Sequence, residues 1–282
     1  MPHTTQPLLD LVTLEGQLDE LQARYAAAEP FPHITLDDVL HPDALRAVCE
    51  DFDAVPAAGW TNYLHLNERK YGHTRPELWG DALRALREEL SSDRFVDLVS
   101  RLTGIEGLHA DDVMDGGGLH RSLPGGFLNV HTDFTAHHSK PHWRRRVNLL
   151  LYLNPEWQPE WGGDLELWSR DMQRCVTTVP PVANRMLLFT TDVDSYHGHP
   201  EPLRCPDGQA RRSLALYYFT IEPHVHARST NYRSRPGDGA RGVLIYLDKG
   251  ALRVYDALKR HLRLSDGFVS RALGAVSRRR RG

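Results

Sequence analysis

Residues 125–134 read GGFLNVHTDF, a short apolar stretch that ends in a histidine and an aspartate separated by one residue. We expect a strand over Gly126–His131, because the stretch is short and Gly residues precede it. Residues i and i+2 of a strand point the same way, so His131 and Asp133 can approach one ion together. A His-x-Asp pair alone carries little weight, and its meaning depends on what the rest of the chain supplies.

Further short apolar stretches, rich in β-branched and aromatic residues, follow this one, and Gly, Pro and Asn clusters separate them. The expected strands are Arg146–Leu153, Asp164–Trp168, Cys175–Val179, Arg185–Thr190 and Arg212–Ile221. Several short strands with turns between them favour an antiparallel sandwich or jelly roll.

The first 107 residues have a different pattern, which predicts a mainly helical region. Apolar residues recur at helical spacing over 8–28, a short strand is expected at 31–35, and Pro42 opens a helix that runs to about Phe52. Two more helices are expected within 81–103, broken near Ser91. The sequence therefore predicts an α+β protein with a mainly β core, N-terminal helices and a helical C-terminal extension.

One domain is expected over residues 1–282, with a mainly helical part at 1–107, a jelly-roll core at 108–222 and an extension at 223–282. The extension ends in VSRRRRG. Four arginines in a row can bind a phosphate backbone or an acidic membrane, but a solvated tail is the interpretation we favour.

A third metal ligand is expected from DSYHGHP, residues 194–200, which follows the apolar strand at 185–190. His197 and His199 are both candidates. His199 precedes Pro200 and lies further into the turn, so we favour His197 and keep His199 as the alternative. Two histidines and one carboxylate on one face of the ion are the ligands of non-haem Fe(II) oxygenases.

A cosubstrate such as 2-oxoglutarate needs a cation for its far carboxylate, and the planar fork of arginine matches a carboxylate in two parallel hydrogen bonds. The stretch ARRSLALY, residues 210–217, offers two arginines. Arg211 and Ser213 share one face of the expected strand and can reach the same carboxylate. Arg212 would point outward, and its use in place of Arg211 is the alternative.

Together these stretches resemble the Fe(II)/2-oxoglutarate-dependent dioxygenases, in the prolyl 4-hydroxylase-like branch. The resemblance covers about residues 110–221 and rests on GGFLNVHTDF, RRVNLLLYLNPEWQPEWGGDLELW, ANRMLLFTTDVDSYHGHPEP and RRSLALYYFT. It implies a double-stranded β-helix, which is a jelly roll flanked by helices. It also implies that His131, Asp133 and His197 bind Fe(II).

By the same resemblance, Arg211 would bind 2-oxoglutarate with help from Ser213. Tyr152 would hydrogen-bond the same carboxylate, unless it is a packed core tyrosine. Arg146 is expected near the mouth of the barrel, where it could meet substrate.

The implied reaction is hydroxylation of an unactivated C–H bond, with release of succinate and CO2. It uses Fe(II), 2-oxoglutarate and O2, with ascorbate as a candidate reductant. We favour a small molecule or biosynthetic intermediate as substrate. The alternatives are a prolyl hydroxylase that acts on a peptide or protein and a non-catalytic jelly-roll binding module with a vestigial metal site.

Composition limits the other possibilities. A formal net charge of −3 gives no indication of a nucleic-acid partner. Three scattered cysteines favour reduced thiols in a cytoplasmic protein over a disulfide or zinc framework. The sequence shows no signal peptide and no apolar run that could span a membrane. It leaves the oligomeric state open.

Overall fold

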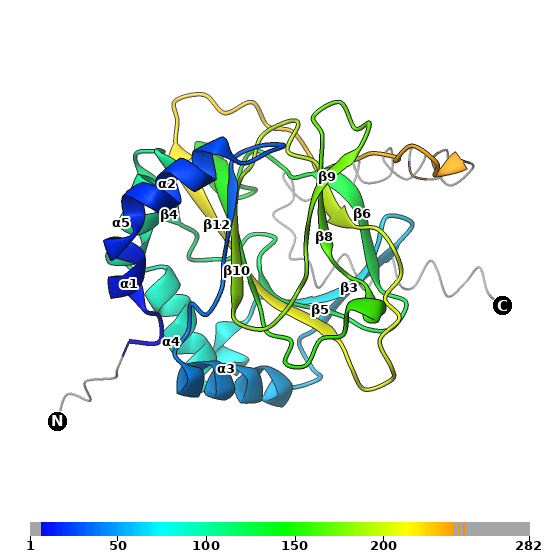
Figure 1. Cartoon of the computed structure of the whole chain (residues 1–282), viewed down its shortest axis with the longest axis horizontal. Helices are drawn as coiled ribbons and strands as arrows, with labels where there is room; N and C mark the ends of the chain where they lie inside the picture. Colours follow the sequence, from blue (N-terminus) through cyan, green and yellow to red (C-terminus); the bar gives the residue numbers. More distant parts are fainter. Residues whose placement is uncertain (1–6, 240–241, 243–244, 246–282) are drawn as a thin grey trace.

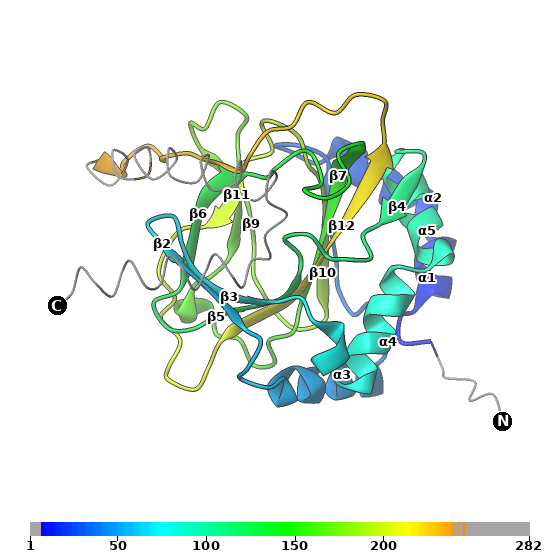
Figure 2. The same cartoon turned by 180° about the vertical axis from the view of Figure 1, so that it is seen from behind.

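The computed structural model describes residues 7–239, 242 and 245. Its strands form one antiparallel network in the order β1-β10-β7-β12-β5-β3-β6-β11-β8-β9, with β4, β2 and β13 attached to β12, β3 and β6. The network curls on itself, so that two layers face each other across an interior (Figures 1 and 2). The paired strands β5 and β3 join the two layers.

The first layer lies against the helices. It contains β1 (His33–Leu36), β4 (Leu108–Ala110), β5 (Gly118–Ser122), β7 (Trp143–Tyr152), β10 (Arg185–Thr190) and β12 (Arg211–Ile221). The second layer contains β2 (Thr61–His65), β3 (Glu68–His73), β6 (Phe127–Thr132), β8 (Leu165–Trp168), β9 (Cys175–Val179), β11 (His197–His199) and β13 (Asn231–Tyr232).

Helices cover the outside of the first layer (Figure 1). They are α1 (Leu11–Gly16), α2 (Leu18–Ala27), α3 (Pro42–Ala54), α4 (Asp81–Leu90) and α5 (Asp93–Thr103), with single 3₁₀ turns at Pro76–Leu78 and Pro159–Trp161. Ser92 caps α5 by accepting a hydrogen bond from the backbone N–H of Phe95, and Gly104 ends it in the left-handed conformation at φ 68°. Within the described residues, no helix has the length and apolar character needed to cross a bilayer.

Strand alternation separates the core from the site. Three side chains of β7 point outward and pack with the helices, each with none of its surface exposed: Val147, Leu149 and Leu151. The intervening residues Asn148 and Leu150 line the interior cavity. One sheet therefore supplies both the outer hydrophobic core and the inner wall of the site.

The structure confirms the predicted fold class, a mainly β jelly roll flanked by N-terminal helices. β9 and β10 have the expected bounds, whereas β7 begins three residues earlier than expected. The helical prediction for residues 1–107 missed the β2–β3 hairpin, because the sequence TNYLHLNERKYGH lacks an apolar run. The expected extension helix and the Arg-rich tail lie outside the described residues, and the domain boundaries stay a prediction.

Candidate metal centre and cosubstrate pocket

Two histidines meet across neighbouring strands. His131 on β6 and His197 at the start of β11 are direct cross-strand partners, and their ring centroids lie 4.5 Å apart. Asp133 follows β6 immediately, and one ligand atom from each of the three residues lies within 4.8 Å of the others. The structure thus brings together the three predicted metal ligands.

Gly198 allows this close approach. A Cβ atom at this position would lie 2.8 Å from the backbone oxygen of Leu128 and 2.9 Å from that of Asn129. Both contacts are with backbone, which cannot move aside without shifting β6. The stretch His-Gly-His therefore needs glycine between its histidines for β11 to pack against β6.

Backbone carbonyls fix the tautomer of both histidines. Nδ1 of His131 lies 2.9 Å from the carbonyl oxygen of Asn129, and Nδ1 of His197 lies 3.0 Å from that of Ser195. A carbonyl only accepts, so each Nδ1 carries the hydrogen. Each Nε2 lone pair is then free for a metal, and the ring orientation is set before the metal binds.

Two side chains of β7 hold the carboxylate of Asp133. Its Oδ2 atom accepts a hydrogen bond from Asn148 Nδ2 at 2.8 Å and forms an ion pair with the Arg145 guanidinium at 3.0 Å. Burial raises the pKa of Asp133, but the charge of Arg145, the largest of the opposing effects, helps to hold it well below its ordinary value. The site therefore offers two neutral imidazole nitrogens and one carboxylate, a donor set that fits Fe(II).

Arg211 lies deeper in the same interior and is 6% exposed. Its Nε donates to the backbone oxygen of Gly163 at 2.7 Å, and its Nη2 donates to the Tyr152 hydroxyl at 3.3 Å. Ser213 is a cross-strand partner of Tyr152 and lines the same cavity. Tyr152 thus contacts Arg211, and Ser213 lines the same cavity as Arg211. Tyr152 itself is not among the residues that line the cavity, and it packs in an apolar cluster, which is the alternative expected for it.

The remaining predicted residues lie elsewhere. His199 lines the cavity but is not one of the three clustered ligands, and its buried Nδ1 has no hydrogen-bond partner among the described residues. Arg212 points outward and pairs with Asp53, as expected. Arg146 does not line the cavity; it lies 3.4 Å from Glu222.

A β-bulge decides which arginine of the run at 144–146 faces the site. Val147 pairs with Tyr218 on β12, but the next pair is Arg145 with Phe219, so Arg146 is an extra residue. A bulge re-aims the side chains beside it. Counting alternate residues back from Asn148 places Arg146 inward, whereas the bulge turns Arg145 inward in its place. No feature of the single sequence marks this bulge.

The cavity that the candidate metal ligands line measures about 180 Å³, and its walls carry ionisable side chains. On β3, Lys70 lies 3.1 Å from Glu68, and both side chains are largely buried. Burial raises the pKa of Glu68, but Lys70 and His65 outweigh this and lower it, so the pair is charged. Neither residue was predicted from the sequence, because the hairpin that carries them contains no apolar run.

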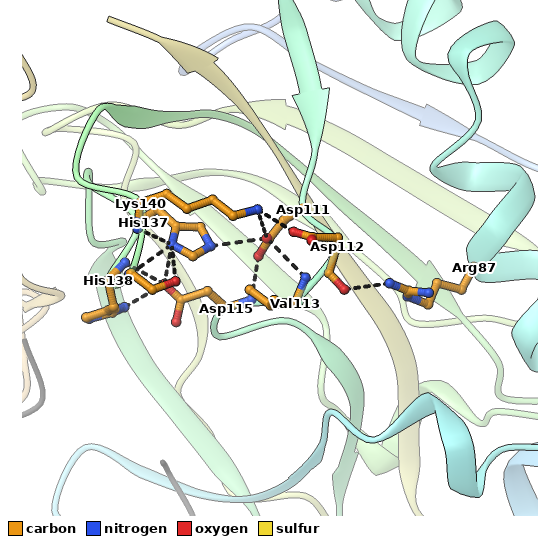
Figure 3. Close-up of polar contacts among 9 residues, drawn as sticks. Arg87, Asp111, Asp112, Val113, Asp115, His137, His138 and Lys140 are labelled. Atoms are coloured by element: carbon orange, nitrogen blue, oxygen red, sulfur yellow. Dashed lines mark hydrogen bonds and ion pairs between the residues drawn. The ribbon is translucent and has the colours of Figure 1, made fainter. Parts of the chain in front are cut away.

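A second wall comes from the loop between β6 and β7. His138 lines the cavity, and its Nδ1 lies 2.7 Å from Oδ2 of Asp115 (Figure 3). The carboxylate accepts the Nδ1 hydrogen, so the Nε2 atom of a neutral His138 is a hydrogen-bond acceptor. His137, the preceding residue, is not among the residues that line the cavity, and its Nε2 lies 3.1 Å from Oδ1 of Asp111 (Figure 3).

Comparison with known proteins identifies the core of the chain. Residues 117–219 match the model of the 2OG-Fe(II) oxygenase superfamily. This segment belongs to that superfamily. Enzymes of this superfamily use Fe(II), 2-oxoglutarate and O2, and the match over this segment supports a dioxygenase. No curated protein sequence matches it.

Solved structures share the fold of this oxygenase. A prolyl-4-hydroxylase from Pseudomonas putida is 20% identical, with a TM-score of 0.53, and the match covers 71% of this chain and 98% of that one. A Trichoplax adhaerens prolyl hydroxylase in complex with a hypoxia inducible factor peptide fragment is 18% identical, with a TM-score of 0.55 and coverage of 77% and 94%. A 2OG-Fe(II) oxygenase family oxidoreductase from Burkholderia pseudomallei is 14% identical, with a TM-score of 0.50 and coverage of 73% and 92%.

Proposed function

We propose that this dioxygenase hydroxylates an unactivated C–H bond of a polar small molecule or biosynthetic intermediate. His131, Asp133 and His197 would hold Fe(II), and Arg211, Tyr152 and Ser213 would bind the far carboxylate of 2-oxoglutarate. The observation that carries the proposal is the convergence of the three ligand atoms within 4.8 Å, in the same cavity as a buried arginine.

The residues of the chain have separable tasks in this reaction. The metal, when bound, supplies the oxidising chemistry, in which O2 and 2-oxoglutarate yield succinate, CO2 and a hydroxylated product. His131 and His197 present oriented Nε2 lone pairs. Burial raises the pKa of Tyr152, so this residue stays a neutral phenol that can donate to a carboxylate.

The cavity walls support a polar small-molecule substrate. Glu68, Lys70 and His138 all line the cavity, and each is already oriented by a partner within the protein. The donors and acceptors that these groups still have free are costly to bury unless they too make hydrogen bonds. A small molecule with hydroxyl, amine or carboxyl groups offers those bonds, whereas the apolar ring of a proline does not.

A peptidyl-proline substrate is the second candidate function. Prolyl hydroxylases are among the solved structures with the same fold, and one was determined with a peptide fragment bound. Both are 20% identical or less to this chain. These structures therefore share only the fold with this chain, and a peptidyl-proline substrate is an alternative to be tested.

Succinate release is the test of this proposal. Wild type and His131→Ala would be incubated with 2-oxoglutarate, Fe(II) and ascorbate, first alone and then with panels of polar small molecules and of proline-containing peptides. We expect turnover in wild type alone, stimulated by a member of the small-molecule panel. Stimulation by peptides only would favour the second candidate, and equal background in both proteins would favour a vestigial site.

We also propose a reducing, cytoplasmic setting. All three cysteines are free thiols in the structure, and Cys49 and Cys205 are buried. Fe(II) chemistry is compatible with such a setting. Labelling with a cell-impermeant thiol or amine reagent in intact cells would check this, since a cytoplasmic protein escapes modification.

A further inference from the structure

Two residues that have no role in the proposed function hold the carboxylate of Asp133. Both belong to β7, the strand that follows the loop after β6. Asn148 donates to Oδ2 at 2.8 Å, and the guanidinium of Arg145 approaches the same oxygen at 3.0 Å. Oδ2 also lies 3.4 Å from Nε2 of His197, and Oδ1 lies 3.6 Å from Nε2 of His131.

Arg145 is itself fixed on several sides. It is 2% exposed, and its Nε donates to Oδ1 of Asn148 at 2.7 Å, which joins the two residues into one unit. Its guanidinium carbon lies 3.3 Å from the ring centroid of Tyr217 and 4.7 Å from that of Phe134. Such stacking fixes the plane of the guanidinium, so its direction toward Asp133 is set by packing.

The loop between β6 and β7, which follows Asp133 and leads to Arg145, is braced near its middle. His137 Nε2 lies 3.1 Å from Asp111 Oδ1, and the backbone N–H of Ser139 donates to His137 Nδ1 at 3.1 Å (Figure 3). His138 is tied to Asp115 in the same network. The loop is therefore anchored at Asp133 by the β7 residues and near its middle by the 111–115 segment.

We propose that Arg145 and Asn148 are positioning residues of the metal centre, which hold the Asp133 carboxylate through Oδ2 so that it binds the metal through one oxygen. This inference rests on the proposed function. A carboxylate that binds through both oxygens would take an additional coordination position. Restriction to one oxygen keeps three positions free, which is the number that a chelating cosubstrate and O2 require.

The test uses Co(II) binding to the anaerobic, metal-free full-length protein, followed by visible d–d absorption. The variants are Asn148→Ala, Arg145→Gln and Arg145→Lys, with His131→Ala as the loss-of-ligand reference. Arg144→Gln is the matched control, since Arg144 lies on the same strand and pairs with Asp192 and Glu222 at the surface. Thermal unfolding of each metal-free protein reports whether it is folded.

We expect Asn148→Ala and Arg145→Gln to bind Co(II) about 10- to 100-fold more weakly and to show a shifted absorption band. Arg145→Lys keeps the charge but loses the planar fork, so it should fall between them and wild type. Arg144→Gln should match wild type in both readouts. A purely structural role would lower the unfolding temperature and leave the band of the bound metal unchanged.

Wild-type affinity and an unchanged band in Asn148→Ala would overturn the inference, even if Arg145→Gln fails to fold, because Asn148 acts on the same oxygen. In that case the proposed function would remain intact if wild type binds Co(II) and His131→Ala does not. Absence of Co(II) binding in wild type would contradict the metal centre itself and the inference with it.

Discussion

At the residue scale, the candidate metal ligands are oriented by groups of the chain itself. Each histidine donates its Nδ1 hydrogen to a carbonyl two residues earlier in its own chain segment. Asp133 is held by a hydrogen bond and an ion pair from β7. The sequence predicted that these three residues meet, because residues i and i+2 of a strand point the same way and a later strand can return beside the first. It could not predict Arg145, because the bulge at Arg146 reverses the expected alternation.

Arg211 gives the first prediction at this scale. Arg211→Met should weaken 2-oxoglutarate binding at least 30-fold, because loss of one member of a buried charge pair costs about 2–5 kcal/mol. The measurement is an anaerobic titration of the Fe(II)-loaded protein with 2-oxoglutarate. Arg212→Met is the control, since Arg212 points outward to Asp53. Equal weakening in both variants would refute the assignment.

Tyr152 gives a smaller effect at the same subsite. Tyr152→Phe removes the hydroxyl that lies 3.3 Å from Arg211 and keeps the ring that packs with Phe189 and Leu165. One hydrogen bond is worth about 1 kcal/mol, so the Kd for 2-oxoglutarate should rise about fivefold. The same titration measures it, and an unchanged Kd would leave Tyr152 as a core residue only.

At the element scale, the site depends on how closely β11 packs against β6. The expected strands were found where apolar runs are flanked by glycine or proline, as for β9 and β10. The two-residue spacing of His197 and His199 gave no sign of a strand, because β11 has only three residues and is defined by its pairing to β6 and β8. Tertiary pairing of this kind is not encoded in local pattern.

Gly198→Ala tests this packing. The added Cβ would meet backbone atoms of β6 at 2.8–2.9 Å, so β11 must shift and His197 must move away from His131. We expect a loss of about 1–3 kcal/mol in the free energy of unfolding, as for other overpacked sites, together with weaker Co(II) binding. Urea unfolding and the Co(II) titration measure the two effects.

Gly16→Ala is the control for this substitution, since nothing lies within 4 Å of its added Cβ. If Gly198→Ala and Gly16→Ala bind Co(II) equally well, the strand approach does not control the site.

At the scale of the whole molecule, the helices and the site lie on opposite faces of one sheet layer. This arrangement was predictable in class, because the N-terminal helices and the later strands have different apolar periods. What could not be predicted is the curling that brings the β2–β3 hairpin over the cavity, since neither strand of the hairpin contains an apolar run. The charged wall of Glu68 and Lys70 therefore appeared only in the structure.

The buried interior also makes stability depend on pH. Burial, followed by the charge of Lys70, lowers the pKa of His120 to about 3 from its ordinary value of 6.5. Below pH 6.5 the unfolded chain binds a proton that the folded protein does not, so stability is full above pH 6.5 and falls as the pH drops toward 3. One pKa unit is worth about 1.4 kcal/mol, and His120 keeps some solvent contact, so we expect a contribution of about 1 kcal/mol at pH 5.

Urea unfolding of the metal-free protein at pH 7 and pH 5 measures this contribution. His120→Gln should lose less stability than wild type between the two pH values, by about that 1 kcal/mol. Parallel losses in the two proteins would show that His120 does not contribute to the acid sensitivity.

The central claim, that His131, Asp133 and His197 hold a metal to which 2-oxoglutarate binds beside Arg211, is tested most directly by the anaerobic visible spectrum. Fe(II) and 2-oxoglutarate would be added to wild type, His131→Ala and Arg211→Met. We predict a weak charge-transfer band in wild type, none in His131→Ala, and in Arg211→Met a band only at much higher 2-oxoglutarate. Folded, iron-loaded wild type that shows no band, or an undiminished band in His131→Ala, would contradict the account.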